Sequence, residues 1–187
     1  MTQLRKNRVL GIDPGTQILG YGIIEYGPNI YKVLDCSVIK LNKLEDDQTK
    51  LREIFLQIQD IIEANQTGIL SIELPFYGKN PQSMLKLGRA QGVAIAAAIV
   101  MGVEIHEFSA KKIKKAVTGN GNASKEQVCD MISRLLNYQI DSKYYDASDA
   151  LAAAYCYTCQ NQNGLSDQNG PTSWKSFISS HPDRIHK

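Results

Sequence analysis

The chain has 187 residues, of which 43% are hydrophobic and 21% charged, and its formal net charge is only +2. These values predict one globular domain with a sizeable core, and they exclude a disordered chain and a protein that binds nucleic acid through bulk charge alone. No uninterrupted apolar run approaches the roughly 18 residues of a membrane helix. The polar first residues lack the apolar segment of a secretory signal. We therefore expect a cytoplasmic protein with no membrane contact.

Three strand-like stretches open the chain, at about residues 8–13, 20–26 and 31–40. The Gly-Pro-Asn turn at residues 27–29 indicates a hairpin, so the three strands are expected to form an antiparallel meander. Apolar residues then recur at helical spacing across residues 51–62, which predicts an amphipathic helix packed on the sheet.

Strands and helices alternate in the rest of the chain. We expect a strand at 68–73, a helix from Asn80 and Pro81, a strand at 103–108, and helices at 109–117, from Ser124, and at 146–159. This order predicts an α/β fold with a mixed five-stranded sheet and helices on both faces. We assign residues 1–160 to this domain, and the polar residues 161–187 to a flexible C-terminal tail.

The helix that begins after Asn80 carries small residues at four-residue steps, at Gly88, Gly92 and Ala96. Residues four apart lie on the same face of a helix, so this stripe predicts a surface for close packing. Its partner is either the chain's own sheet or a second copy of the chain, and the sequence leaves both open.

Four acidic residues stand where an element begins or ends. Asp13 closes the first strand before a Pro-Gly turn, and Glu73 closes the fourth strand. If these two strands are neighbours, both carboxylates emerge at the same edge of the sheet. Asp146 and Asp149 are three residues apart at a helix start, which places them on one face.

Each acid also has a purely structural interpretation. Asp13 could form the turn, Asp146 could cap its helix, and Asp149 could interact with the helix dipole. Glu73 has the weakest such alternative, because glutamate is a poor strand terminator. The occurrence of all four together favours a shared site.

Converging carboxylates repel one another unless cations lie between them. Ligand sets made only of oxygen favour Mg²⁺ or Mn²⁺ over zinc. Two such ions can activate a water and stabilise the leaving oxygen of a phosphodiester. The sequence therefore predicts a metal-dependent phosphodiesterase whose ligands are Asp13, Glu73, Asp146 and Asp149.

Lysines close to these acids in the sequence suggest phosphate contacts. Lys111, Lys112, Lys114 and Lys115 fall within five residues, and Lys125 follows a glycine-rich loop at a helix start. A local basic patch can hold a phosphate backbone even on a nearly neutral protein. The competing interpretation is a solvated helix face.

A short loop after Glu73 contains two neighbouring aromatic residues and a lysine. Phe76 and Tyr77, with Lys79 beside them, suit stacking on splayed bases. Burial of Phe76 against the sheet is the alternative.

Four segments together resemble the RuvC family of bacterial Holliday junction resolvases, which have an RNase H-like fold. The segments are LGIDPGTQILGYGII (10–24), IELPFYGKNPQSMLKLGRAQGVAIAAA (72–98), FSAKKIKKAVTGNGNASKEQV (108–128) and DASDALAAA (146–154). They follow the family's order and span about residues 8–160. The segment after Gln160 does not align.

This resemblance implies an endonuclease that resolves four-way DNA junctions by paired symmetric nicks, leaving 5′-phosphate and 3′-hydroxyl ends, in recombination and repair. It also implies a homodimer, two Mg²⁺ ions per active site with Mn²⁺ as a substitute, and cooperation with RuvA and RuvB. The family's catalytic acids correspond to the four acids above, its basic site residues to Lys114 and Lys125, and its base-stacking residue to Phe76.

We therefore expect two sets of site residues. The catalytic set is Asp13, Glu73, Asp146, Asp149 and Lys125, and the DNA-binding set is Phe76, Tyr77, Lys79, Lys111, Lys114 and Lys125.

Three other functions fit parts of the sequence. A related nuclease acting on ribosomal RNA precursors also starts with a Gly-Ile-Asp strand, and it would cut RNA in preference to junctions. A sugar kinase or actin-like ATPase shares a GIDPGT-like loop, but it needs two such domains and would bind ATP. A non-catalytic junction-binding module would not need the acids, which repel DNA.

Overall fold

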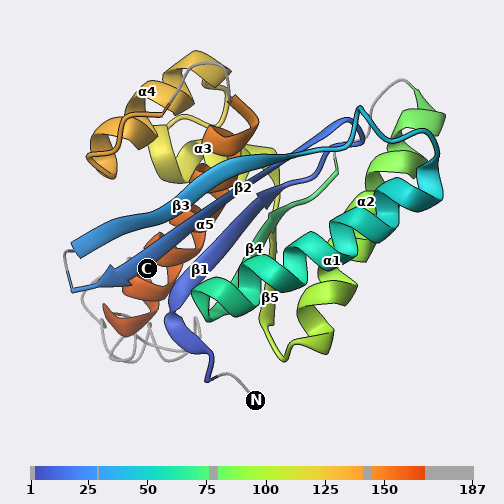
Figure 1. Cartoon of the computed structure of the whole chain (residues 1–187). Coiled ribbons are helices and arrows are strands. Elements are labelled where there is room, and N and C mark those ends of the chain that lie inside the picture. Colours follow the sequence, from blue (N-terminus) through green and yellow to red (C-terminus); the bar gives the residue numbers. More distant parts are fainter. Residues whose placement is uncertain (1–2, 29, 76–79, 141–144, 167–187) are drawn as a thin grey trace, which may run out of the picture.

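The computed structural model describes residues 3–28, 30–75, 80–140 and 145–166 (Figure 1). Its elements are β1 (Arg5–Asp13), β2 (Ile18–Gly27), β3 (Ile30–Lys40), α1 (Asp47–Asn65), β4 (Thr67–Glu73), α2 (Pro81–Val100), β5 (Glu104–Phe108), α3 (Ala110–Thr118), α4 (Lys125–Leu135) and α5 (Tyr145–Ser166). The predicted order of elements is confirmed. α5 continues six residues past the boundary drawn at residue 160, and residues 167–187 lie outside the described residues, so the division into domain and tail stays a prediction.

The sheet is mixed and has the strand order β3-β2-β1-β4-β5. β1, β2 and β3 form the expected antiparallel meander, and β4 pairs in parallel with β1 on one side and with β5 on the other. Because β1 and β4 are parallel neighbours with Ile12 opposite Ile72, the residues that follow, Asp13 and Glu73, emerge at the same edge. This confirms the adjacency on which the prediction for these two acids depended.

Helices cover both faces of the sheet, with α1 and α2 on one face and α3, α4 and α5 on the other (Figure 1). Side chains alternate between the faces along each strand. In β1, Leu10 and Ile12 join the core under α1 and α2, whereas Val9 joins the core under α5. Asp13 has the same parity as Val9, so its side chain lies on the α5 face.

Glycines let α5 approach the sheet closely. A Cβ atom added at Gly11 would lie 1.9 Å from the Ala150 carbonyl oxygen, and one at Gly20 would lie 2.0 Å from the Asp146 carbonyl oxygen. Both distances are far shorter than any contact between such atoms, so side chains at these positions would push the helix away. The first turns of α5 therefore rest directly on the backbone of β1 and β2.

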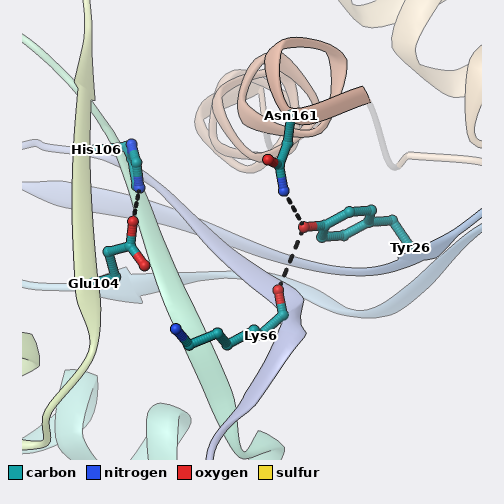
Figure 2. Close-up of polar contacts among 5 residues, drawn as sticks. All are labelled: Lys6, Tyr26, Glu104, His106 and Asn161. Carbon is teal, nitrogen blue, oxygen red and sulfur yellow. Dashed lines mark hydrogen bonds and ion pairs between the residues drawn. The ribbon is translucent and has the colours of Figure 1, made fainter. Parts of the chain in front are cut away.

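Hydrogen bonds fix α5 along its length. The buried Ser71 hydroxyl of β4 donates to the Ala153 carbonyl at 2.5 Å. Further along, the Tyr26 hydroxyl donates to the Lys6 carbonyl at 3.3 Å and accepts from the Asn161 Nδ2 at 3.0 Å (Figure 2). These bonds attach the helix that carries Asp146 and Asp149 to β4 and β2, and Tyr26 in turn bonds to β1.

Among the described residues, α2 is the one helix long and apolar enough to cross a membrane by length and composition. A core helix of a soluble protein meets the same criterion. One face of α2 is buried, through Ala90, Ala94, Ala97 and Ala98, and it packs against α1 and the sheet. We therefore assign α2 to this domain, with one face packed against α1 and the sheet and the other face exposed.

Candidate active site

Three carboxylates from two elements meet at the end of the sheet. Asp13 comes from the end of β1, and Asp146 and Asp149 come from the first turns of α5. One oxygen atom from each lies within 4.8 Å of the others, and all three residues are half-buried. The predicted convergence of these acids is present in the structure.

Glu73 is the fourth acid of the site. It closes β4 on the same face as Asp13 and is half-buried. It lies outside the tight group of three. It is still near enough to the group that its charge raises the pKa of Asp13.

One alternative interpretation of Asp146 is wrong. The sequence left open that Asp146 caps its helix, but α5 already begins at Tyr145, so Asp146 lies within the first turn. Its carboxylate belongs to the cluster with Asp13 and Asp149. Its position at the positive end of the helix dipole favours negative charge there as well.

Lys125 is held at the site by the start of α4. Ser124 and Gln127 form the predicted capping box, which makes Lys125 the first residue of that helix. Its Nζ donates to the Asp149 Oδ2 at 2.8 Å. The Lys125 side chain remains 58% exposed, so it bridges the acid cluster and the solvent.

Lys114 lies on the neighbouring helix, α3. Its Nζ donates to the Ala123 carbonyl at 2.8 Å, just before the start of α4. Burial and the charge of Asp149 raise the pKa of Glu73, and the positive charge of Lys114 partly opposes them, which places Lys114 in electrostatic reach of the acids. Lys114 and Lys125 therefore form the basic side of the site.

Burial and mutual repulsion make the acids hard to ionise. Burial, then the charges of Asp149 and Glu73, raise the pKa of Asp13 to about 8, against the opposing effect of Lys125. Burial and the charge of Asp149 likewise raise the pKa of Glu73. The charge of the cluster is therefore compensated only in part by the protein's own lysines.

The pKa of Lys125 is also raised, which for a lysine favours the charged form. Burial lowers it, but the hydrogen bond to Asp149 and the charges of Asp149 and Asp13 outweigh burial and raise it. Lys125 is thus a firmly protonated cation at neutral pH, able to neutralise an acid or a phosphate.

The donor set fits a hard divalent cation. All candidate ligands are carboxylate oxygens, which Mg²⁺ and Mn²⁺ prefer. Burial, and then the charges of the neighbouring acids, raise the pKa of Asp13, and a bound cation would favour its ionised form. Asp13, Asp146 and Asp149 could hold the first ion together, and Glu73 could contribute to a second.

The remaining predicted DNA contacts are only partly described. Lys111 is exposed on α3. Phe76, Tyr77 and Lys79 lie outside the described residues, so their assignments stay predictions.

Sequence reasoning missed the glycines that seat α5. Gly20 pairs with Asp13 across β1 and β2, and its backbone touches Asp146. Gly22 has the same parity and contacts the Leu151 side chain. The signal was present, because two glycines two residues apart in an apolar strand indicate close approach of another backbone on one face.

The order of the sheet and the cluster of acids at its edge define a nuclease with an RNase H-like fold. The family model for crossover junction endodeoxyribonuclease RuvC matches residues 9–157. The chain belongs to the RuvC family.

Relatives and a solved structure agree with this assignment. A crossover junction endodeoxyribonuclease RuvC from Bacteroides fragilis is 45% identical over 184 residues, covering 97% of each chain. One from Cytophaga hutchinsonii is 47% identical over 177 residues, covering 95% of this chain and 87% of the relative. The structure of Thermus thermophilus RuvC in complex with a Holliday junction substrate is 26% identical, with a TM-score of 0.78 over 84% of this chain and 96% of that one.

Proposed function

We propose that this protein is a metal-dependent endonuclease that resolves Holliday junctions by paired symmetric nicks, in homologous recombination and DNA repair. The observation that carries the proposal is the cluster of Asp13, Asp146 and Asp149 beside Glu73, with Lys125 bonded to Asp149, in a chain of the RuvC family. The likeness to a RuvC bound to a Holliday junction supports the choice of substrate.

The four acids are the proposed ligands of two Mg²⁺ ions per site, for which Mn²⁺ can substitute. When bound, the ions supply an activated water and charge stabilisation at the leaving oxygen, which gives 5′-phosphate and 3′-hydroxyl ends. Because α5 packs closely on Gly11 and Gly20, it holds Asp146 and Asp149 near Asp13. Lys125 orients the Asp149 carboxylate and presents a positive charge to the scissile phosphate.

The proposed DNA contacts surround this cluster. Lys111 and Lys114 of α3, with Lys125, hold the phosphate backbone. Phe76 and Tyr77 stack on bases at the junction centre, and Lys79 contacts the backbone. Stacking by Phe76 would keep the strands apart while the metal site acts.

A homodimer with one site per subunit is the proposed assembly, since two symmetric nicks need two sites. The exposed face of α2 supports it. The residues of this α2 stripe are Leu85, Gly88, Gly92, Ala96 and Ile99. Leu85 and Ile99 are 70% and 59% exposed, and a Cβ atom at either glycine meets nothing within 4 Å. Exposed apolar residues beside glycines suit close packing of two helices.

The variant Gly92→Arg should convert the dimer to a monomer, because it places a large charge in the α2 stripe. Arginine is a better helix former than glycine by roughly 0.8 kcal/mol, so the helix itself should persist. Light scattering after size exclusion measures the mass. Ser83→Arg, exposed on α2 outside the stripe, is the matched control and should stay dimeric. A dimeric Gly92→Arg variant would move the interface elsewhere.

Cooperation with RuvA and RuvB and a cytoplasmic location complete the proposal. Membership of the RuvC family supports both.

The proposal is tested with a labelled synthetic four-way junction beside linear duplex and an RNA–DNA hybrid. Paired nicks on the junction alone, dependent on Mg²⁺ and abolished by EDTA, are expected. Preferential cutting of the hybrid would assign the protein to an RNA substrate, and cutting in EDTA would contradict the metal mechanism.

A further inference from the structure

A groove lies on the α5 face of the sheet, separate from the cluster of acids. Its walls come from the start of β3, from α3, and from α5 well beyond its catalytic first turns. The lining residues are Tyr31, Lys112, Lys115, Ala116, Tyr155, Cys156, Cys159 and Gln160. The groove has a volume of about 460 Å³, and none of its lining residues is acidic.

The two lysines give this groove a net positive charge. Lys112 is held in place, with its Nζ donating to the Gln160 Oε1 at 2.9 Å and lying 4.9 Å from the centre of the Phe108 ring. Among the ion pairs of the described residues, none involves Lys112 or Lys115. Both charges are therefore available to an anionic ligand.

The rest of the groove lining includes aromatic and polar side chains. The rings of Tyr31 and Tyr155 pack with their centres 5.3 Å apart at an angle of 55°. This packing limits the motion of both rings. Gln160 adds a side-chain amide next to Lys112. Lysine, tyrosine and glutamine side chains are the groups that commonly contact phosphate and sugar in protein–DNA complexes.

The helix α3 contributes lysines both to the proposed catalytic site and to the groove. Lys114 on this helix lies in reach of Glu73, whereas Lys112 and Lys115 line the groove. Lys111 is exposed at the start of the same helix. The lysines of α3 thus form a basic path from the acids to the groove.

Helix geometry gives the length of this path. Asp149 and Gln160 are eleven residues apart on α5, which corresponds to roughly 16 Å at 1.5 Å per residue. Duplex DNA covers this distance in about five base pairs, at 3.4 Å per base pair.

We propose that the groove of Lys112, Lys115, Tyr31 and Tyr155 binds the sugar–phosphate backbone of a duplex arm about five base pairs from the scissile phosphate. It provides affinity and sets the direction of the arm, and takes no part in bond cleavage. The inference rests on the proposed junction substrate, but it assigns a contact that neither the acids nor the Phe76 loop provides.

The first test is the salt dependence of junction binding in EDTA, measured for Lys112→Gln/Lys115→Gln. Each lost phosphate contact should reduce the slope of log K against log salt by about 0.9, so the double variant should lose nearly two units. Lys43→Gln/Arg52→Gln removes the same charge from exposed positions near and on α1, across the sheet, and should keep the wild-type slope. On a junction in which only the arm that reaches the groove is shortened to three base pairs, the wild type and the groove variant should bind alike.

The second test uses Cys159, a half-buried thiol that lines the groove. A junction with a disulfide-activated linker on the backbone five base pairs from the cleavage site should cross-link to the wild type. Cys159→Ser should not cross-link, and a linker twelve base pairs away should fail with both proteins.

The outcomes separate this inference from the proposed function. The groove proposal is wrong if the wild type cuts junctions but Lys112→Gln/Lys115→Gln keeps the wild-type salt slope. It is also wrong if Lys43→Gln/Arg52→Gln loses as much slope as the groove variant. In both cases the proposed function still holds. Unchanged DNA binding would point to an acidic protein as the ligand instead. If the wild type neither binds nor cuts junctions, the proposed function itself fails.

Discussion

Asp13→Asn is expected to abolish cleavage and, at the same time, to stabilise the protein in EDTA above pH 8. The loss of activity follows because Asp13 is one of the three clustered carboxylates of the proposed metal site, with an oxygen within 4.8 Å of oxygens of Asp146 and Asp149. Asparagine has the same shape but carries no charge. The loss should exceed the roughly 10–100-fold that removing an outer-shell partner of a metal site costs.

The gain in stability follows from the raised pKa of Asp13. The pKa is about 8 in the folded protein, against 3.8 for an unperturbed aspartate carboxyl group. Between these values the folded state retains a proton that the unfolded chain releases, so the free energy of unfolding falls as pH rises from about 4 to 8. Above pH 8 the folded protein carries the full penalty of the buried charge. The asparagine side chain of the variant cannot ionise and avoids this penalty, which is at most about 6 kcal/mol for a shift from 3.8 to about 8, at roughly 1.4 kcal/mol per pKa unit.

Thermal unfolding in EDTA from pH 6 to 9 measures this effect. The melting temperature of the wild type should fall with pH relative to Asp13→Asn, by a few degrees for each kcal/mol. Added Mg²⁺ or Mn²⁺ should stabilise the wild type and leave the variant nearly unchanged. Asp60→Asn, an exposed acid on α1, is the control for loss of charge alone. Retained cleavage, or a less stable Asp13→Asn protein at pH 9, would contradict the assignment.

Gly20→Ala is expected to cost at least about 100-fold in cleavage rate while the protein still folds. Its Cβ would lie 2.0 Å from the Asp146 carbonyl oxygen, so the first turn of α5 must move by about 1 Å or more. Displacements of this size at a catalytic centre can reduce rates about 100-fold. Overpacking of this kind typically destabilises by about 1–3 kcal/mol, which a domain with two apolar cores should survive.

The control for Gly20→Ala lies on the same strand. Gly27 ends β2, and a Cβ there meets nothing within 4 Å, so Gly27→Ala should cleave like the wild type. A metal titration separates a positioning effect from general damage, because Gly20→Ala should need more Mn²⁺ for half-maximal activity at an unchanged circular dichroism spectrum. Wild-type cleavage by Gly20→Ala would mean that α5 can shift without moving its carboxylates.

Local rules of the sequence determined most of the fold. Strand and helix periods, the Asn80 cap and the capping box from Ser124 to Gln127 depend on residues close together in the chain, and the structure contains them as expected. The mixed sheet followed from the order of elements. The four acids could be found because each stands at the end of an element, and element ends can be recognised locally. The spacing of the acids predicted only a metal-dependent phosphodiesterase, and the resemblance to RuvC segments predicted the four-way junction as its substrate.

The tertiary structure alone decided how the site is assembled. α5 packs on Gly11 and Gly20, which are more than 120 positions away in the chain. The hydrogen bond from Lys125 to Asp149 joins residues 24 positions apart. The pKa of Asp13 depends on burial and on charges brought from β4, α4 and α5, so no local pattern could give it. The groove of Lys112 and Tyr31 likewise exists only where three elements meet. The sequence determined which side chains were available for chemistry, and packing of the helices on the sheet decided their distances, charges and partners.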